Sequence, residues 1–409
     1  MAMAADALAI AEVRTGDDRL LALVQGLSGL SEATRDYPAN EVPGGDPSIN
    51  IEAAVEAEDV GSAMAGLLGR IEGGDDPAAI RSTVIDAVSA HHRGYGHGII
   101  YTQKSFELLD RIGWDAAPDL LPHLLSRIVH HTREDTLPYM RKAMRELSSL
   151  DLGTLATESE SWSARPESTW DPGVFADRLL QADEAPIVAA AELMGAGAGV
   201  EGVLDSVTLA VSERLLRHNL DVEFDNSELF GWLDITHGLT TARAARWAWR
   251  QHPSPAALRS ALFAVWLAYD TGRSERRHGR AGARAPLDHW AYDQTNGTIE
   301  TASITDAVLW RRPHEAVALA LAGDSDQQRQ AVTGQLLDAA LADRAGSFIV
   351  LAHLVKTSQA AVEEAEVVGS PIPVAAAARF LAAPRLERFV ARAVSESADF
   401  IRTGAPPKR

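Results

Sequence analysis

The segment around residues 348–361 has apolar residues at helical spacing, and that spacing places a histidine and a lysine on the buried side. Ile349, His353, Lys356 and Ala360 fall on one face of the expected helix. Imidazole is a common ligand of iron, zinc and copper, and a buried ammonium is strongly disfavoured unless it is paired or loses its proton. A deprotonated Lys356 could take up carbon dioxide, and the resulting carbamate would be an oxygen ligand for a metal. The competing interpretation is a lysine that runs along the helix to solvent or pairs with a buried acid.

A second histidine of this kind lies in the middle of the chain. Leu233, His237, Thr240 and Ala244 share one inward face of an expected helix, and Gly238 follows the histidine directly. A glycine there indicates that another part of the chain comes close. We therefore predict His237 and His353 as metal ligands or catalytic bases, each from its own helix. The alternative is a core histidine that is bonded only to a backbone carbonyl.

The first third of the chain offers three further histidines. His92 and His97 belong to a stretch with glycines at positions 94, 96 and 98, and His97 begins an expected helix. Glycines allow a tight backbone path, so His97 could be a ligand held by a rigid turn, or a residue that caps the helix at the surface. Helical spacing continued from Leu121 and Ile128 turns His131 inward, where a neutral core histidine is the competing interpretation.

Two acids follow His131 closely. Glu134 and Asp135 would be natural hydrogen-bond partners for a metal ligand at position 131.

The elements that must position these residues are helices. Alanine and leucine dominate, alternating β-branched runs are scarce, and the apolar periodicity is helical. We predict an all-α multi-helix bundle in which the ligands converge from separate helices. Residues 1–75 are expected to hold one helix (18–32) and a Pro/Gly-rich connection, and residues 403–409 a disordered tail. The catalytic body, 76–402, is expected to comprise blocks 76–150, 172–270 and 299–402, separated by an exposed linker (151–171) and a loop-like segment (271–295).

Composition excludes several classes of protein. The chain has 409 residues, no cysteine and a formal charge of -19. Without cysteine there is no disulfide, thiolate catalysis or cysteine-bound cluster, and the negative charge argues against nucleic acid as a partner. The only basic stretch, 273–284, is read as a solvated loop. No signal peptide or apolar run of about 20 residues is evident, so we expect a cytoplasmic protein with no membrane partner.

Two short motifs together resemble the questin-oxidase-like family: His237 followed by Gly-Leu, and His353 followed by Leu-Val-Lys356-Thr. Members known as anthraquinone ring-opening oxygenases use non-haem iron with several histidines and a carboxylated lysine. The resemblance spans roughly residues 85–365 and implies that His237, His353 and Lys356 are ligands, with Lys356 as the carbamate. The family's N-terminal Asn-His-x-x-His motif is absent, so the remaining ligands are sought first at His97, then His131, then His92.

The expected function follows from this resemblance. It is an Fe(II)-dependent oxygenase that uses dioxygen on an aromatic, anthraquinone-like polyketide, by oxidative C–C cleavage or Baeyer–Villiger-type oxygen insertion. One alternative is a cofactor-free oxygenase with His237 or His353 as the base. Another is a non-enzymatic helical scaffold that buries these histidines for packing. A di-iron centre is rejected because the sole Glu-x-x-His pair, Glu275 and His278, lies in an Arg/Gly-rich segment.

Overall fold

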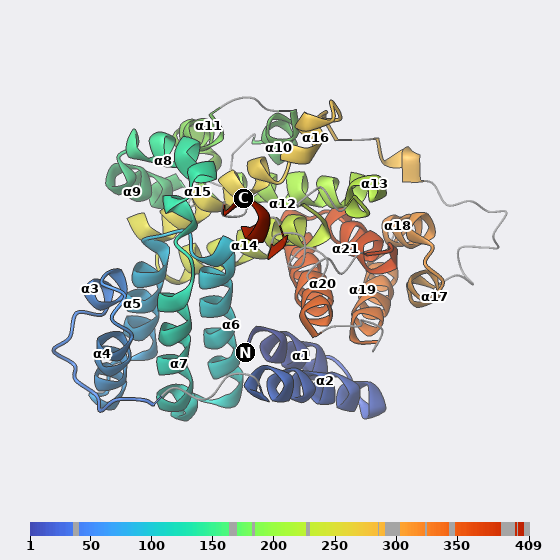
Figure 1. The fold of residues 1–409 in the computed structure, drawn as a ribbon. Helices are drawn as coiled ribbons and strands as arrows, with labels where there is room; N and C mark the ends of the chain where they lie inside the picture. The colour runs from blue at the N-terminus through green and yellow to red at the C-terminus, as the bar shows by residue number, and fades with distance from the viewer. Residues whose placement is uncertain are drawn as a thin grey trace.

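The computed structural model is built from helices (Figure 1). It describes the whole chain except residues 36–40, 163–169, 182–184, 226–229, 285, 291–302, 324, 343–347, 386–396, 399 and 405–409. In the described part there is no strand, and the isolated bridge between Arg93 and Arg133 is the single β-type contact. The all-α class is therefore confirmed. Residues 405–409 of the expected tail lie outside the described residues.

The first block contains the helices α1 to α9. Their bounds are α1 Ala2–Glu12, α2 Gly16–Arg35, α3 Ile51–Glu56, α4 Val60–Glu72, α5 Pro77–Ser89, α6 His97–Ile112, α7 Ala117–His130, α8 Arg141–Ser148 and α9 Leu152–Trp162. The expected start of α5 is confirmed, because the Asp76 side chain accepts a hydrogen bond from the Ala79 amide (2.8 Å). Helix α9 occupies part of the segment expected to be an exposed linker; the remainder, 163–169, lies outside the described residues.

The N-terminal 75 residues differ from the single helix that their sequence predicts, because they form four. Helix α1 is apolar on most sides and lacks the stripe that marks a surface helix; it forms a hairpin with α2 and also contacts α6 and α20. Helices α3 and α4 are short and begin at the side-chain caps Asn50 and Asp59. The Pro/Gly-rich stretch therefore connects helices rather than replacing them.

The middle and C-terminal blocks contain the remaining helices. Their bounds are α10 Pro172–Gln181, α11 Pro186–Leu193, α12 Gly199–Arg217, α13 Leu220–Glu223, α14 Trp232–Gln251, α15 Pro255–Asp270, α16 Arg273–Arg277, α17 Ile304–Leu309, α18 Pro313–Leu321, α19 Asp326–Leu341, α20 Phe348–Val368 and α21 Ile372–Ala382. The expected loop 271–295 includes the short helix α16, and its residues 285 and 291–295 lie outside the described part.

Helix α14 lies at the centre of the fold and organises the three blocks. It contacts α6 of the first block, α12 and α15 of the middle block, and α20 of the last. In Figure 1 the helices α3–α7 lie to one side of α14 and α19–α21 to the other. A site built on α6, α14 and α20 therefore lies where all three blocks meet.

One helical stretch, 186–217, has the length and apolar composition of a membrane span. Of its most apolar window, 56% is buried inside the fold. Gly197, with a positive φ of 106°, interrupts its helical backbone. We interpret this stretch as a core element of the fold.

Gly238 has the close neighbour that its sequence context predicts. A β-carbon at this position would lie 2.8 and 3.1 Å from the two γ-carbons of Val211 on α12. Val211 is fully buried, so it has little room to give way. The glycine thus sets the distance between α12 and the helix that carries His237.

We expect Gly238→Ala to lower the free energy of unfolding by about 1–3 kcal/mol, because overpacking outweighs the better helix propensity of alanine. Urea denaturation measures the change. Gly334→Ala on α19 is the matched control, because its nearest neighbour beyond the local chain would be 3.7 Å away, and we expect it to stabilise by about 0.5–1 kcal/mol. Equal stability of Gly238→Ala and the parent would contradict this account of the packing.

Candidate metal centre

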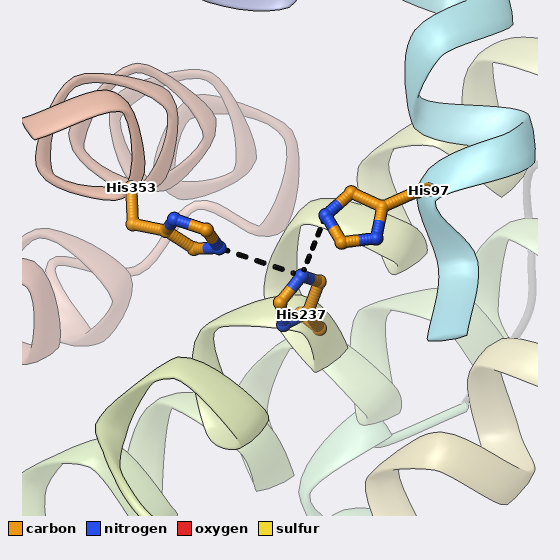
Figure 2. A group of neighbouring side chains, drawn as sticks. All are labelled: His97, His237 and His353. Atoms are coloured by element: carbon orange, nitrogen blue, oxygen red, sulfur yellow. Dashed lines mark hydrogen bonds between the residues drawn. The ribbon is translucent and has the colours of Figure 1, made fainter. Parts of the chain in front are cut away.

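Three histidines from three blocks meet at the junction of α6, α14 and α20. His97 is the first residue of α6, and His237 and His353 lie in the second turns of α14 and α20. The Nε2 atoms of His97 and His237 are 3.0 Å apart, and those of His237 and His353 are 3.5 Å apart. Figure 2 shows the three rings turned toward one another. One nitrogen from each ring lies within 4.8 Å of the other two.

Backbone carbonyls fix which nitrogen of each ring carries the proton. The Nδ1 atoms of His97, His237 and His353 lie 2.6–2.7 Å from the carbonyl oxygens of Gly94, Leu233 and Ile349. A carbonyl oxygen only accepts, so each Nδ1–H donates and each neutral ring presents a lone pair at Nε2. Three lone pairs therefore face one another without a hydrogen between them, so the three nitrogens could hold a metal ion.

The spacing of these atoms suits a transition metal. Nitrogen ligands about 2.0–2.1 Å from one metal ion, in tetrahedral or octahedral arrangement, lie about 2.9–3.4 Å apart. The separations of 3.0 and 3.5 Å that involve His237 agree with this geometry. His97 and His353 need only a small inward movement to complete the set, since their nitrogens are within 4.8 Å.

Burial keeps the three rings neutral. It lowers the pKa of His97 to about 3 and the pKa values of His237 and His353 well below their ordinary range, with Lys356 as the next cause in each case. At neutral pH these rings are therefore unprotonated. Neutral rings leave their Nε2 lone pairs free for a metal ion.

Lys356 lies near enough to the trio for its charge to lower the pKa of each histidine. It is 5% exposed, which excludes the alternative of a lysine that reaches solvent. Burial lowers its pKa to about 7, and the charge of Asp6 opposes this shift. Among the described residues it has no hydrogen-bond or ion-pair partner. Close to neutral pH much of this amine is unprotonated, which is the state that can form a carbamate or bind a metal.

Asp6, the buried acid whose charge acts on the pKa of Lys356, is already paired with another lysine. Asp6 of α1 contacts Lys104 of α6 at 2.5 Å, and Lys104 also pairs with Glu107 at 2.9 Å. Arg243 of α14 joins Glu107 to Glu363 of α20. These pairs connect the helices of the histidine trio further along their length. Asp6 is thus bonded to Lys104, and among the described residues no ion pair joins Lys356 to an acid.

His131 lies beside the trio but outside it. Helix α7 ends at His130, and His131 has an extended backbone (φ -69°, ψ 138°), so the inward face expected from α7 does not reach it. Its ring centroid is 6.2 Å from that of His97, and Tyr101 lies against both rings. Burial lowers the pKa of His131 to about 4. The expected acidic partner, Asp135, instead binds His91 at 2.7 Å.

His92 is separate from the trio. It lines a small cavity, together with Thr241 and Phe263, and its ring lies against Phe263 with centroids 5.1 Å apart. Its Nε2 is buried without a hydrogen-bond partner among the described residues, and burial lowers its pKa to about 4. Of the six predicted ligands, the structure thus brings together His97, His237 and His353, places Lys356 near them, and leaves His131 and His92 out.

Sequence reasoning missed Tyr95. Its ring meets His237 edge-on, with centroids 5.6 Å apart and an interplanar angle of 77°. The only sequence signal was its position between two glycines directly before His97.

Comparisons with protein-family models, with curated proteins and with solved structures found no match. The proposed chemistry therefore depends on the site itself, and the family resemblance stays a hypothesis.

We expect Lys356→Met to stabilise the metal-free protein by roughly 1–4 kcal/mol at pH 7. The pKa of Lys356 is lower in the folded protein (about 7) than its ordinary value of 10.5, so the unfolded chain binds the proton more readily. Lysine therefore destabilises the fold increasingly as the pH falls from 10.5 toward 7. Urea denaturation at several pH values measures the difference, which should shrink toward pH 10.

Lys104→Met is the matched control for this prediction. It leaves the buried carboxylate of Asp6 without its cation, so it should destabilise the protein by about 3–5 kcal/mol. A destabilising Lys356→Met at pH 7 would show that Lys356 is charged and paired in the folded protein.

Proposed function

We propose that His97, His237 and His353 hold a single metal ion, and that the protein is a metal-dependent oxygenase. The observation that carries the first part is the convergence of three buried Nε2 lone pairs whose opposite nitrogens are fixed by carbonyls. Neutral imidazoles with such hydrogen-bonded Nδ1–H groups are the usual form of histidine ligands in metal sites.

Iron(II) is the metal we propose. Three imidazoles, with Lys356 or its carbamate as a nitrogen or oxygen ligand, form a set that suits non-haem iron and leaves coordination positions for substrate or dioxygen. An iron(II) ion held there would supply the electrons that activate dioxygen. The choice of iron, and of an aromatic anthraquinone-like substrate, is supported by the resemblance of the His237 and His353–Lys356 motifs to the questin-oxidase-like family.

The site favours a metal over the cofactor-free alternative. A histidine base must accept a proton at a pH near neutrality, whereas burial and Lys356 lower the pKa values of all three histidines far below that range. A scaffold role explains the packing of the rings but not the turning of three lone pairs toward one point.

Metal analysis of protein prepared without a histidine tag tests this proposal. We expect about one metal ion per chain in the parent, and loss of at least about 90% of it in His237→Ala and His353→Ala, because each removes a ligand. His130→Ala is the matched control: its Nδ1 also bonds a carbonyl, that of Ser126 at 2.7 Å, but the residue is not part of the trio.

The outcomes separate the possibilities. Loss of metal in Lys356→Met as well would make the lysine a ligand, whereas retention would restrict the protein ligands to the histidines. A parent that takes up no iron, cobalt or zinc while remaining folded would overturn the metal centre. Iron-loaded protein is then assayed for oxygen consumption with hydroxyanthraquinones and their hydroquinones; no consumption with bound iron would remove the oxygenase part alone.

A further inference from the structure

The turn Gly94–Gly96 has an unusual backbone and contacts two of the three histidines. Its three residues have positive φ angles: 55° for Gly94, 57° for Tyr95 and 94° for Gly96. Glycine adopts this conformation freely, but Tyr95 carries a β-carbon that disfavours it. A β-carbon at Gly96 would collide with the hydroxyl of Thr241 on α14. The turn is therefore pressed against the helix that carries His237.

Tyr95 is a partly buried side chain that contacts α14 directly through His237 and indirectly through Arg273. Its ring meets the His237 ring edge-on, at 5.6 Å between centroids. Its hydroxyl oxygen accepts a hydrogen bond from Arg273 (3.4 Å), and Arg273 also pairs with Asp234 in the first turn of α14 (3.5 Å). When a residue at a candidate site is held in an unfavourable backbone conformation, this indicates that its side chain has a role in the site.

We propose that Tyr95 is the positioning residue of the metal centre: held by the left-handed turn, its ring presses on His237 and keeps the His237 Nε2 directed at His97 and His353. This inference rests on the proposed metal site and adds the residue that organises it. The carbonyl of Gly94 in the same turn accepts the Nδ1–H of His97 (2.7 Å). One turn of three residues thus orients two ligands that are 140 positions apart.

Three variants at this position separate the ring from the backbone. Tyr95→Gly removes the ring and suits the positive φ, Tyr95→Ala removes the ring but keeps the unfavourable β-carbon, and Tyr95→Phe keeps the ring without the hydroxyl. Cobalt(II) titration of the metal-free full-length protein, followed by visible absorption, measures affinity. Loss of a residue that orients a ligand typically weakens metal binding about 10- to 100-fold. We expect that loss in Tyr95→Gly and Tyr95→Ala, and a change of no more than about threefold in Tyr95→Phe.

A merely structural role for Tyr95 would give a different pattern. Affinity would then follow stability, and Tyr95→Gly, which relieves the backbone, would bind cobalt at least as well as Tyr95→Ala and close to the parent. Parent-like affinity in both ring-less variants would overturn the proposal.

A second readout is independent of metal. NMR of the histidine side chains in the metal-free protein should show cross-relaxation between the His237 and His97 rings in the parent and in Tyr95→Phe, and its loss in the ring-less variants. Unchanged spectra in all variants would also overturn the proposal. A parent that fails to bind cobalt but shows the expected spectra would refute the metal centre while leaving Tyr95 as the residue that orients His237.

Discussion

The three Nδ1–H hydrogen bonds to backbone carbonyls are the constraint on which the site depends. For His237 and His353 the acceptor is the carbonyl four residues earlier on the same helix, so the helix itself fixes which ring nitrogen carries the proton. Helical side chains lean toward the N-terminus, which explains why ligands near the starts of α14 and α20 meet beyond the helix ends. His97 is the first residue of α6, so no helical carbonyl precedes it. Its Nδ1–H donates instead to the carbonyl of Gly94 in the preceding turn.

The buried cations near the site differ in whether they are paired with acids. Lys104 and Arg243 are balanced by acids on the neighbouring helices, and these pairs connect α1, α6, α14 and α20. Lys356 lies on α20, one of these helices, but it has no such partner among the described residues. Burial without an ion-pair partner among the described residues favours the neutral form of the Lys356 amine, so it gives up its proton readily.

The sequence predicted those features that depend on regular helix geometry. Periodicity placed His237, His353 and Lys356 on inward faces, the cap at Asp76 marked a helix start, and the glycine at 238 indicated a close approach. His131 lies beside His97 as its inward position suggests, but the helix expected to carry it ends one residue earlier, and periodicity cannot foresee where a chain leaves a helix. The exposed side chain of Ile349 (44%) shows the same limit at the other end of a helix, where a face that is buried further along opens to solvent.

Other features depend on contacts between distant segments. Helix α1 was not predicted because it is apolar without a clear stripe, and its burial is decided by α6 and α20. Tyr95 contacts a ring 142 positions away in the sequence, and no local pattern can reveal such a pair.

The distances along the chain between the trio's members have a consequence for folding. Contacts between residues 140 and 116 positions apart raise the contact order of the fold. Because closing such long loops costs conformational entropy, we expect these contacts to form late in folding. In an early collapsed state the three imidazoles are still apart, so no two of them can bind the same metal ion. A ligand that needs all three therefore recognises only the finished native state, and its binding slows the escape from that state more than it speeds the approach to it.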